Sequence, residues 1–229
     1  MNYVCAYELV ALFLIGLVTF FYHYKNWLPL CRNRCFSCLL HLLLFIIALE
    51  IIKRMSELGF IYLSDKDVLV ITGLSFIGVV ITAVLFWLYY LALTLSLNFL
   101  KRKIAIVMFI PAVVMIIFVF MSCFDTGLFY VKDNIAYYDD HDIRIFSIVV
   151  IFYILSGAIA LAKKRNQIKK KQYIFMQISN IVMICFLELY YIPKKRLMLI
   201  YYCVAAVVII YYFIYVEVII CFFKIISFI

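Results

Sequence analysis

The sequence predicts an all-α integral membrane protein: a bundle of seven transmembrane helices with a small external β-hairpin between the fourth and fifth. Hydrophobic residues make up 69% of its 229 residues, against roughly 45–50% apolar residues in soluble globular proteins. Charged residues make up only 14%, and the mean hydropathy is +1.16. Six glycines and three prolines leave little material for long linkers. We therefore expect one transmembrane domain over residues 1–229, connected by short loops.

Seven apolar stretches approach the roughly 20 residues that a helix needs to cross a bilayer. Charged residues interrupt the hydrophobic pattern between them, as expected at the ends of spans. The third stretch carries Ser75, Gly78 and Thr82 at steps of three and four residues, which favours close packing of helices. The fourth contains Pro111, which is expected to kink or break its helix. The predicted helices cover 3–24, 39–62, 68–97, 104–124, 145–162, 173–192 and 197–218, the last extending to 229.

The distribution of basic residues predicts the orientation in the membrane. The first, third and fifth gaps between the helices, with the C-terminal tail, hold 13 of the 21 lysines and arginines. Because positively charged loops stay in the cytoplasm, we expect a multi-pass protein of the cell membrane with its N-terminus outside and its C-terminus cytoplasmic. The net charge of +9 follows from this asymmetry and from anionic inner-leaflet lipid. The bilayer is the expected partner, and no nucleic acid is.

The fourth gap predicts the hairpin. Leu128–Val131 and Ile135–Tyr138 are short β-prone segments, and the intervening Lys132-Asp133-Asn134 favours a tight turn. An acidic segment follows directly, and it has two interpretations. Three carboxylates and an imidazole could form an external cation site or a pH-responsive site; alternatively, they are a solvated boundary before the next helix. The residues concerned are Asp139, Asp140, His141 and Asp142.

Polar residues inside the predicted helices are the other candidates for function, because each costs about 2.5–3.5 kcal/mol to place at the bilayer centre. Glu50 lies in the second helix, with Lys53 and Arg54 one turn later. Asn180 and Glu188 lie close to one face of the sixth. Together, Glu50, Asn180 and Glu188 could line a ligand cavity or a proton path. The alternative is that they hold packed helices together.

Three cysteines precede the second predicted helix. The spacing Cys31-x3-Cys35-x2-Cys38 matches the loop that holds a four-iron cluster in radical S-adenosylmethionine enzymes, and nearby histidines also allow a Cys3His zinc site. However, the chain cannot form the α/β barrel of those enzymes, and cysteines are tolerated in a reducing cytoplasm. The chain also lacks the sequence motifs of serine hydrolases, zinc proteases, P-loop enzymes and dinucleotide-binding enzymes. We predict no catalytic residue, no metal and no cofactor.

The order of several segments resembles a known family. Leu28-Pro29 followed by Asn33-Arg34-Cys35-Phe36 opens the second helix, Glu50 lies within it, and Thr126–Tyr130 precedes the hairpin. A basic loop then leads into two closing helices. This arrangement resembles the seven-helix N-terminal sensor region that precedes GGDEF-type diguanylate cyclase or histidine-kinase domains in Gram-positive bacteria. The sequence ends at Ile229 without such an output domain, so the resemblance implies an input module without its output.

Two functions therefore follow as expectations. The first is a membrane-embedded sensory module that detects an unknown external or intramembrane ligand and relays the signal through its C-terminal helix, as a homodimer or through a separate cytoplasmic output protein. The second is a small transporter, or a substrate-binding membrane subunit, that uses the region of Glu50 and Asn180 as its pocket.

Overall fold

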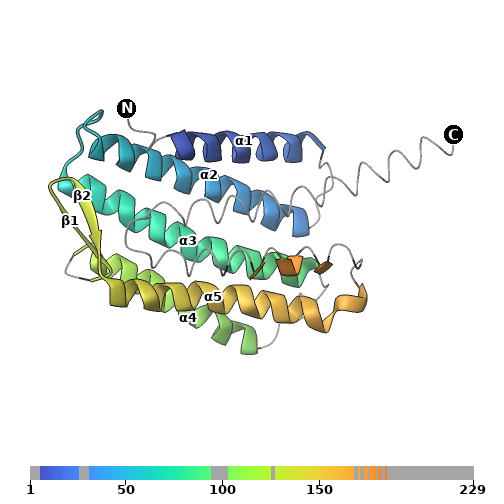
Figure 1. Cartoon of the computed structure of the whole chain (residues 1–229). Helices are drawn as coiled ribbons and strands as arrows, with labels where there is room; N and C mark the ends of the chain where they lie inside the picture. The colour runs from blue at the N-terminus through green and yellow to red at the C-terminus, as the bar shows by residue number, and fades with distance from the viewer. Residues whose placement is uncertain are drawn as a thin grey trace.

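A computed structural model describes residues 6–25, 31–93, 103–124 and 127–167, together with 170, 173–174, 176–178, 180–181 and 184. Within this part of the chain, helices lie side by side and a two-stranded hairpin crosses one end of the bundle (Figure 1). The elements are α1 (Ala6–Lys25), α2 (Cys31–Glu57), α3 (Asp65–Leu93), α4 (Lys103–Ser122), β1 (Phe129–Lys132), β2 (Ile135–Tyr138), α5 (Asp140–Lys163) and a 3₁₀ turn, Arg165–Gln167.

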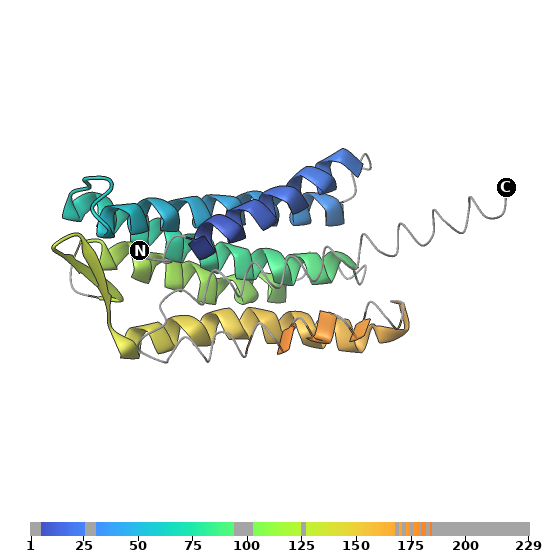
Figure 2. The same cartoon turned by 45° about the horizontal axis from the view of Figure 1, so that its top comes forward.

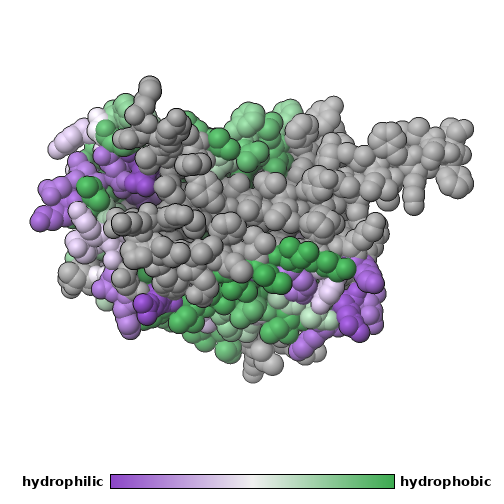
Figure 3. Space-filling model, in the orientation of Figure 1, coloured by the Kyte–Doolittle hydropathy of each residue, from purple (hydrophilic) through white to green (hydrophobic). Residues whose placement is uncertain are grey.

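By length and composition, three described helices could cross a membrane, namely Arg34–Glu57, Asp65–Ala92 and His141–Lys163. Shorter apolar helices cover Leu9–Phe20 and Ile106–Ser122. On the face seen in Figure 3, hydrophilic residues gather at the two ends and hydrophobic ones lie between them. The predicted helical architecture is confirmed, and these helices fit the predicted membrane protein. The few described residues between 173 and 184 are helical, whereas the rest of the predicted helix 173–192 and all of 197–229 lie outside the described residues.

Helix α3 is the centre of the bundle. It contacts α2, α4, α5 and both strands (Figures 1 and 2). The predicted close packing along α3 is confirmed at Gly78, where an added Cβ would lie 2.7 Å from Cγ1 of Ile46 on α2. Ser75 and Thr82, on the same seam, are buried. The Thr82 hydroxyl donates to the Gly78 carbonyl at 2.8 Å. This bond gives the hydroxyl a partner that neither lipid nor apolar side chains could supply.

Helix α2 differs from its prediction at both ends. It begins at Cys31, not at residue 39, because Arg32 and Arg34 are compatible with a helix even though they interrupt the apolar pattern. It ends at Glu57, not at residue 62, because Gly59 adopts φ 75° and closes a Schellman motif. In that motif the Gly59 amide donates to the Ser56 carbonyl and the Phe60 amide donates to the Met55 carbonyl, both at 2.9 Å.

Helix α4 runs through Pro111 without ending there, so of the two expected effects the break is wrong, and a kink stays a prediction. The next amide, of Ala112, donates to the Tyr153 hydroxyl on α5 at 3.2 Å. The same hydroxyl donates to the Met108 carbonyl at 2.7 Å. Tyr153 therefore bridges the backbone groups beside the proline, where an intruding hydroxyl can replace regular helical bonding.

The hairpin between α4 and α5 is confirmed, with its first strand one residue later than predicted. Phe129 pairs with Tyr138 and Lys132 with Ile135 in an antiparallel register. Asp133 and Asn134 form the two-residue turn with φ 53° and 61°, as a type I′ hairpin turn requires.

Candidate functional site

The polar residues at the hairpin end of α2 form two ion pairs in consecutive turns. The Lys53 ammonium lies 2.6 Å from a Glu50 carboxylate oxygen, and Arg54 pairs with Glu57. All four residues fall in the last two turns of one helix, where spacings of three residues bring side chains together. Lys53 is the most enclosed, with 6% of its surface exposed. The pairing of Glu50 with Lys53, which the sequence suggested, is present.

A residue far along the chain completes this cluster. The Lys53 ammonium also donates to the Tyr138 hydroxyl of β2 at 3.3 Å. Burial raises the pKa of the Tyr138 phenol, so the hydroxyl stays neutral and its oxygen is available to accept this bond. We call Glu50, Lys53 and Tyr138 the latch, because together they join the hairpin to α2.

Aromatic packing against α3 also holds the hairpin in place, next to the latch. Phe76 of α3 stacks on Phe129 with ring centroids 5.5 Å apart and an interplanar angle of 3°, and it meets the edge of Phe146 at 4.9 Å. Its ring also lies 5.8 Å from that of Tyr138. At the turn, the Asn134 amide donates to an Asp65 carboxylate oxygen at 2.7 Å. The hairpin is therefore attached to both α2 and α3.

The latch is electrically neutral. A carboxylate and an ammonium satisfy one another, and the neutral phenol adds a hydrogen bond without adding charge. Lys53 is buried and Glu50 is partly buried, so removing the carboxylate would leave a buried ammonium uncompensated, which costs more than the intact pair contributes.

Asn180 lies elsewhere in the bundle. It is 2% exposed, and its Oδ1 accepts a 2.8 Å hydrogen bond from the Tyr90 hydroxyl of α3. Its Nδ2 has no hydrogen-bond partner among the described residues. Ile46, one turn before Glu50 on α2, lies next to Gly78 of α3. Tyr90, the partner of Asn180, is twelve residues further along α3, which is roughly 18 Å along the helix axis from Gly78. The structure therefore does not bring Glu50 and Asn180 into one site, and Glu188 lies outside the described residues.

The acidic segment gives α5 its N-terminal cap. An Asp139 carboxylate oxygen accepts from the amides of His141 at 2.8 Å and Asp142 at 3.3 Å. The exposed His141 imidazole lies 3.4 Å from an Asp142 carboxylate oxygen. Asp140 is the first residue of the helix, and its side chain is not among those described. Capping explains one carboxylate, and a cation-binding or pH-responsive role stays a prediction.

The cysteine segment forms the first turns of α2, not the loop that a metal cluster would need. Cys35 is partly buried and Cys38 is exposed. In the part of the chain that the structure describes, no group of three or more histidine, cysteine or acidic residues is placed to hold a metal ion.

The chain matches no protein-family model, no curated protein and no solved structure. The resemblance to sensor regions of diguanylate cyclases and histidine kinases therefore stays a prediction.

Sequence reasoning missed Tyr138 and Tyr153, each of which joins elements that are far apart in the chain. Only one signal pointed to the first: Lys53 is a charged residue within the predicted helix 39–62, and charged residues inside a span need partners. The residue that supplies the partner is 85 positions away, and no spacing rule reaches that far.

Proposed function

We propose that the protein is a membrane-embedded sensory module whose hairpin is the input element and whose helices carry the response across the bilayer. In this proposal seven helices span the cell membrane, with the N-terminus outside and the C-terminus cytoplasmic. The unequal distribution of basic residues supports that orientation.

The observation that carries the proposal is the latch. Stacking of Phe76 on Phe129 and the Asn134–Asp65 hydrogen bond already attach the hairpin to α3. The Lys53–Tyr138 hydrogen bond instead connects the hairpin to a partly buried ion pair within α2. A ligand that displaces the hairpin would leave Lys53 and Glu50 to rearrange, and α2 would shift with them. This gives the differential interaction between two states that a signal requires.

Alkylation of a native cysteine tests the proposal. Cys38 is exposed near the opposite end of α2, fifteen residues from Lys53, or roughly 22 Å along the helix. We expect Tyr138→Phe, which removes the hydroxyl and keeps the ring, to raise the rate of N-ethylmaleimide labelling of Cys38 several-fold in membranes. The labelled peptide is quantified by mass spectrometry.

Tyr130→Phe is the matched control. It removes a hydroxyl from the same hairpin, but Tyr130 is 51% exposed and its ring stacks on Tyr137. We expect parent labelling rates for this variant. Equal rates at Cys38 in all three proteins would mean that the hairpin does not influence α2, and the sensory proposal would fail.

A second function, a small transporter, is favoured by one observation. The Nδ2 of Asn180 is a buried donor without a partner among the described residues, as a substrate-binding position would be. Flux measurements in proteoliposomes with Asn180→Ala separate the two functions. A substrate flux that this variant abolishes, with Cys38 labelling unaffected by Tyr138→Phe, would favour transport.

A further inference from the structure

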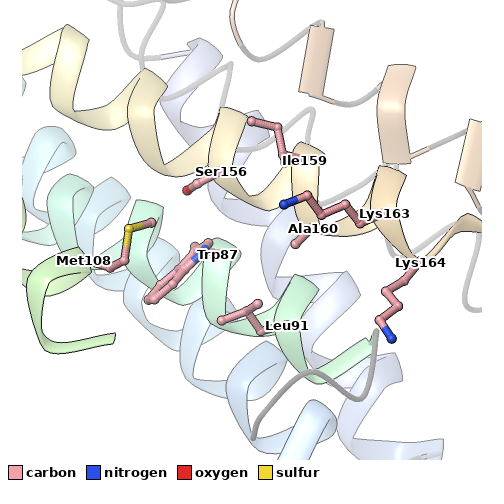
Figure 4. Close-up of a pocket in the computed structure, with 8 residues that line it drawn as sticks. All are labelled: Trp87, Leu91, Met108, Ser156, Ile159, Ala160, Lys163 and Lys164. Atoms are coloured by element: carbon pink, nitrogen blue, oxygen red, sulfur yellow. The ribbon is translucent and has the colours of Figure 1, made fainter. Parts of the chain in front are cut away.

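A cavity of about 290 Å³ lies between α3, α4 and α5, at the end of the bundle away from the hairpin (Figure 4). Its volume is close to the lower end of the range for ligand pockets, roughly 300–1,000 Å³. The walls are mostly apolar and include Trp87 and Leu91 of α3, Met108 of α4 and Ile159 of α5. The space therefore suits part of a hydrocarbon chain better than a polar solute.

Apart from the indole of Trp87, the polar side chains that line the cavity are a serine and two lysines of α5. The Ser156 hydroxyl already donates to the Tyr153 carbonyl at 3.0 Å. Lys163 and Lys164, at the end of α5, complete the lining. Both are exposed, and among the described residues neither forms an ion pair. In Figure 4 the Lys163 ammonium is directed across the cavity, and Lys164 extends away along its edge.

We propose that this cavity binds one acyl chain of an anionic phospholipid, with the lipid phosphate against Lys163 and Lys164. An apolar wall with two cations at one end matches an amphiphile that has an anionic head. The candidate span His141–Lys163 ends at the first of these lysines, which places them at the level of lipid headgroups, where basic residues attract anionic lipid. The proposal requires only that the protein lies in a bilayer, so it is independent of the sensory function.

Another explanation for the two lysines is that they offset the negative end of the α5 dipole. That role explains cations at the end of a helix. It does not explain an apolar cavity beside them.

Trp87 is a built-in probe, because the chain has only two tryptophans. Trp27→Phe leaves Trp87 in the cavity wall as the sole indole fluorophore. We propose to reconstitute this variant in phosphatidylcholine and to titrate in phosphatidylglycerol or phosphatidylcholine with brominated acyl chains. The brominated anionic lipid should quench Trp87 at lower mole fractions, by about fivefold for each lysine that contacts the phosphate. Lys163→Gln/Lys164→Gln should remove this preference.

Two controls locate the effect. Lys66→Gln/Lys132→Gln removes the same charge from exposed positions near the hairpin and should leave the preference intact. Ala160→Leu fills the cavity from its own wall while keeping both lysines, and it should abolish the preference. Equal quenching by the two lipids in the Trp27→Phe protein would overturn the proposal. So would a preference that survives Ala160→Leu, because surface charge alone would then explain it.

Discussion

The hydroxyl of Tyr153 on α5 lies between the Ala112 amide and the Met108 carbonyl of α4, accepting from the first at 3.2 Å and donating to the second at 2.7 Å. Pro111 stands next to this pair and has no amide hydrogen of its own to donate. One side chain thus satisfies the backbone beside the proline and joins two helices.

Tyr153→Phe should destabilise the protein by about 1–3 kcal/mol, because it leaves the buried Ala112 amide and the partly buried Met108 carbonyl without their bridging hydroxyl. Thermal unfolding in detergent, followed by circular dichroism, measures the loss. The control is Tyr130→Phe, which removes a hydroxyl from a half-exposed position and should change little. Equal stability of the two variants would show that α4 does not depend on the bridge.

Gly157→Ala should also destabilise the protein, by about 1–3 kcal/mol. A Cβ at this position would lie 2.5 Å from Cδ2 of Tyr90, so the Tyr90 ring would have to move, and its hydrogen bond to Asn180 with it. Gly16→Ala is the matched control, because its added Cβ meets nothing within 4 Å, and a helical alanine should be neutral or stabilising. The same unfolding assay compares them, and equal losses would contradict the packing argument.

Glu50→Gln should lower the free energy of unfolding by as much as about 3–5 kcal/mol, because it leaves the Lys53 ammonium without its carboxylate partner. Adding Lys53→Met to the same protein should restore part of that stability. Unfolding of the two single variants and the double variant completes a double-mutant cycle. Strictly additive effects would mean that the two residues do not interact energetically.

Asp139→Ala should destabilise α5 by about 0.5–2 kcal/mol, the usual cost of losing an N-cap. Asp139→Asn keeps an oxygen that can accept from the same amides and should retain most of the stability. Helix content and unfolding temperature are the measurements. An Asn variant as unstable as the Ala variant would contradict the capping account, and would show that the negative charge at the start of α5 matters more than the hydrogen bonds.

Helices and hairpin could be predicted from the sequence because they depend on local patterns. Apolar stretches interrupted by charges located α1 to α5, and Asp133-Asn134 located the turn. The errors were at helix ends, where hydropathy is a poor guide. Phe60–Tyr62 continues an apolar pattern, yet Gly59 ends α2 through its backbone conformation.

Of the candidate site, the sequence predicted the ion pair within α2 but not the contact with the hairpin. Glu50 and Lys53 are three residues apart on one helix, so their ion pair follows from helical spacing. Tyr138 joins them only because the hairpin folds back over the end of α2, and this depends on the packing of three elements. A pocket shared by Glu50 and Asn180 would require these residues of different helices to lie at the same depth in the membrane. Spacing along a single helix cannot establish that.

Limited proteolysis of the intact protein tests the transmembrane arrangement most directly. Lys132 in the hairpin and Lys163 to Arg165 at the end of α5 are exposed trypsin sites at opposite ends of the bundle. In sealed right-side-out membranes we expect cleavage after Lys132 and protection of Lys163–Arg165, with the reverse in inverted vesicles, as mass spectrometry of the fragments would show. Cleavage at both sites from the same side would contradict a bundle that crosses the membrane with its hairpin outside.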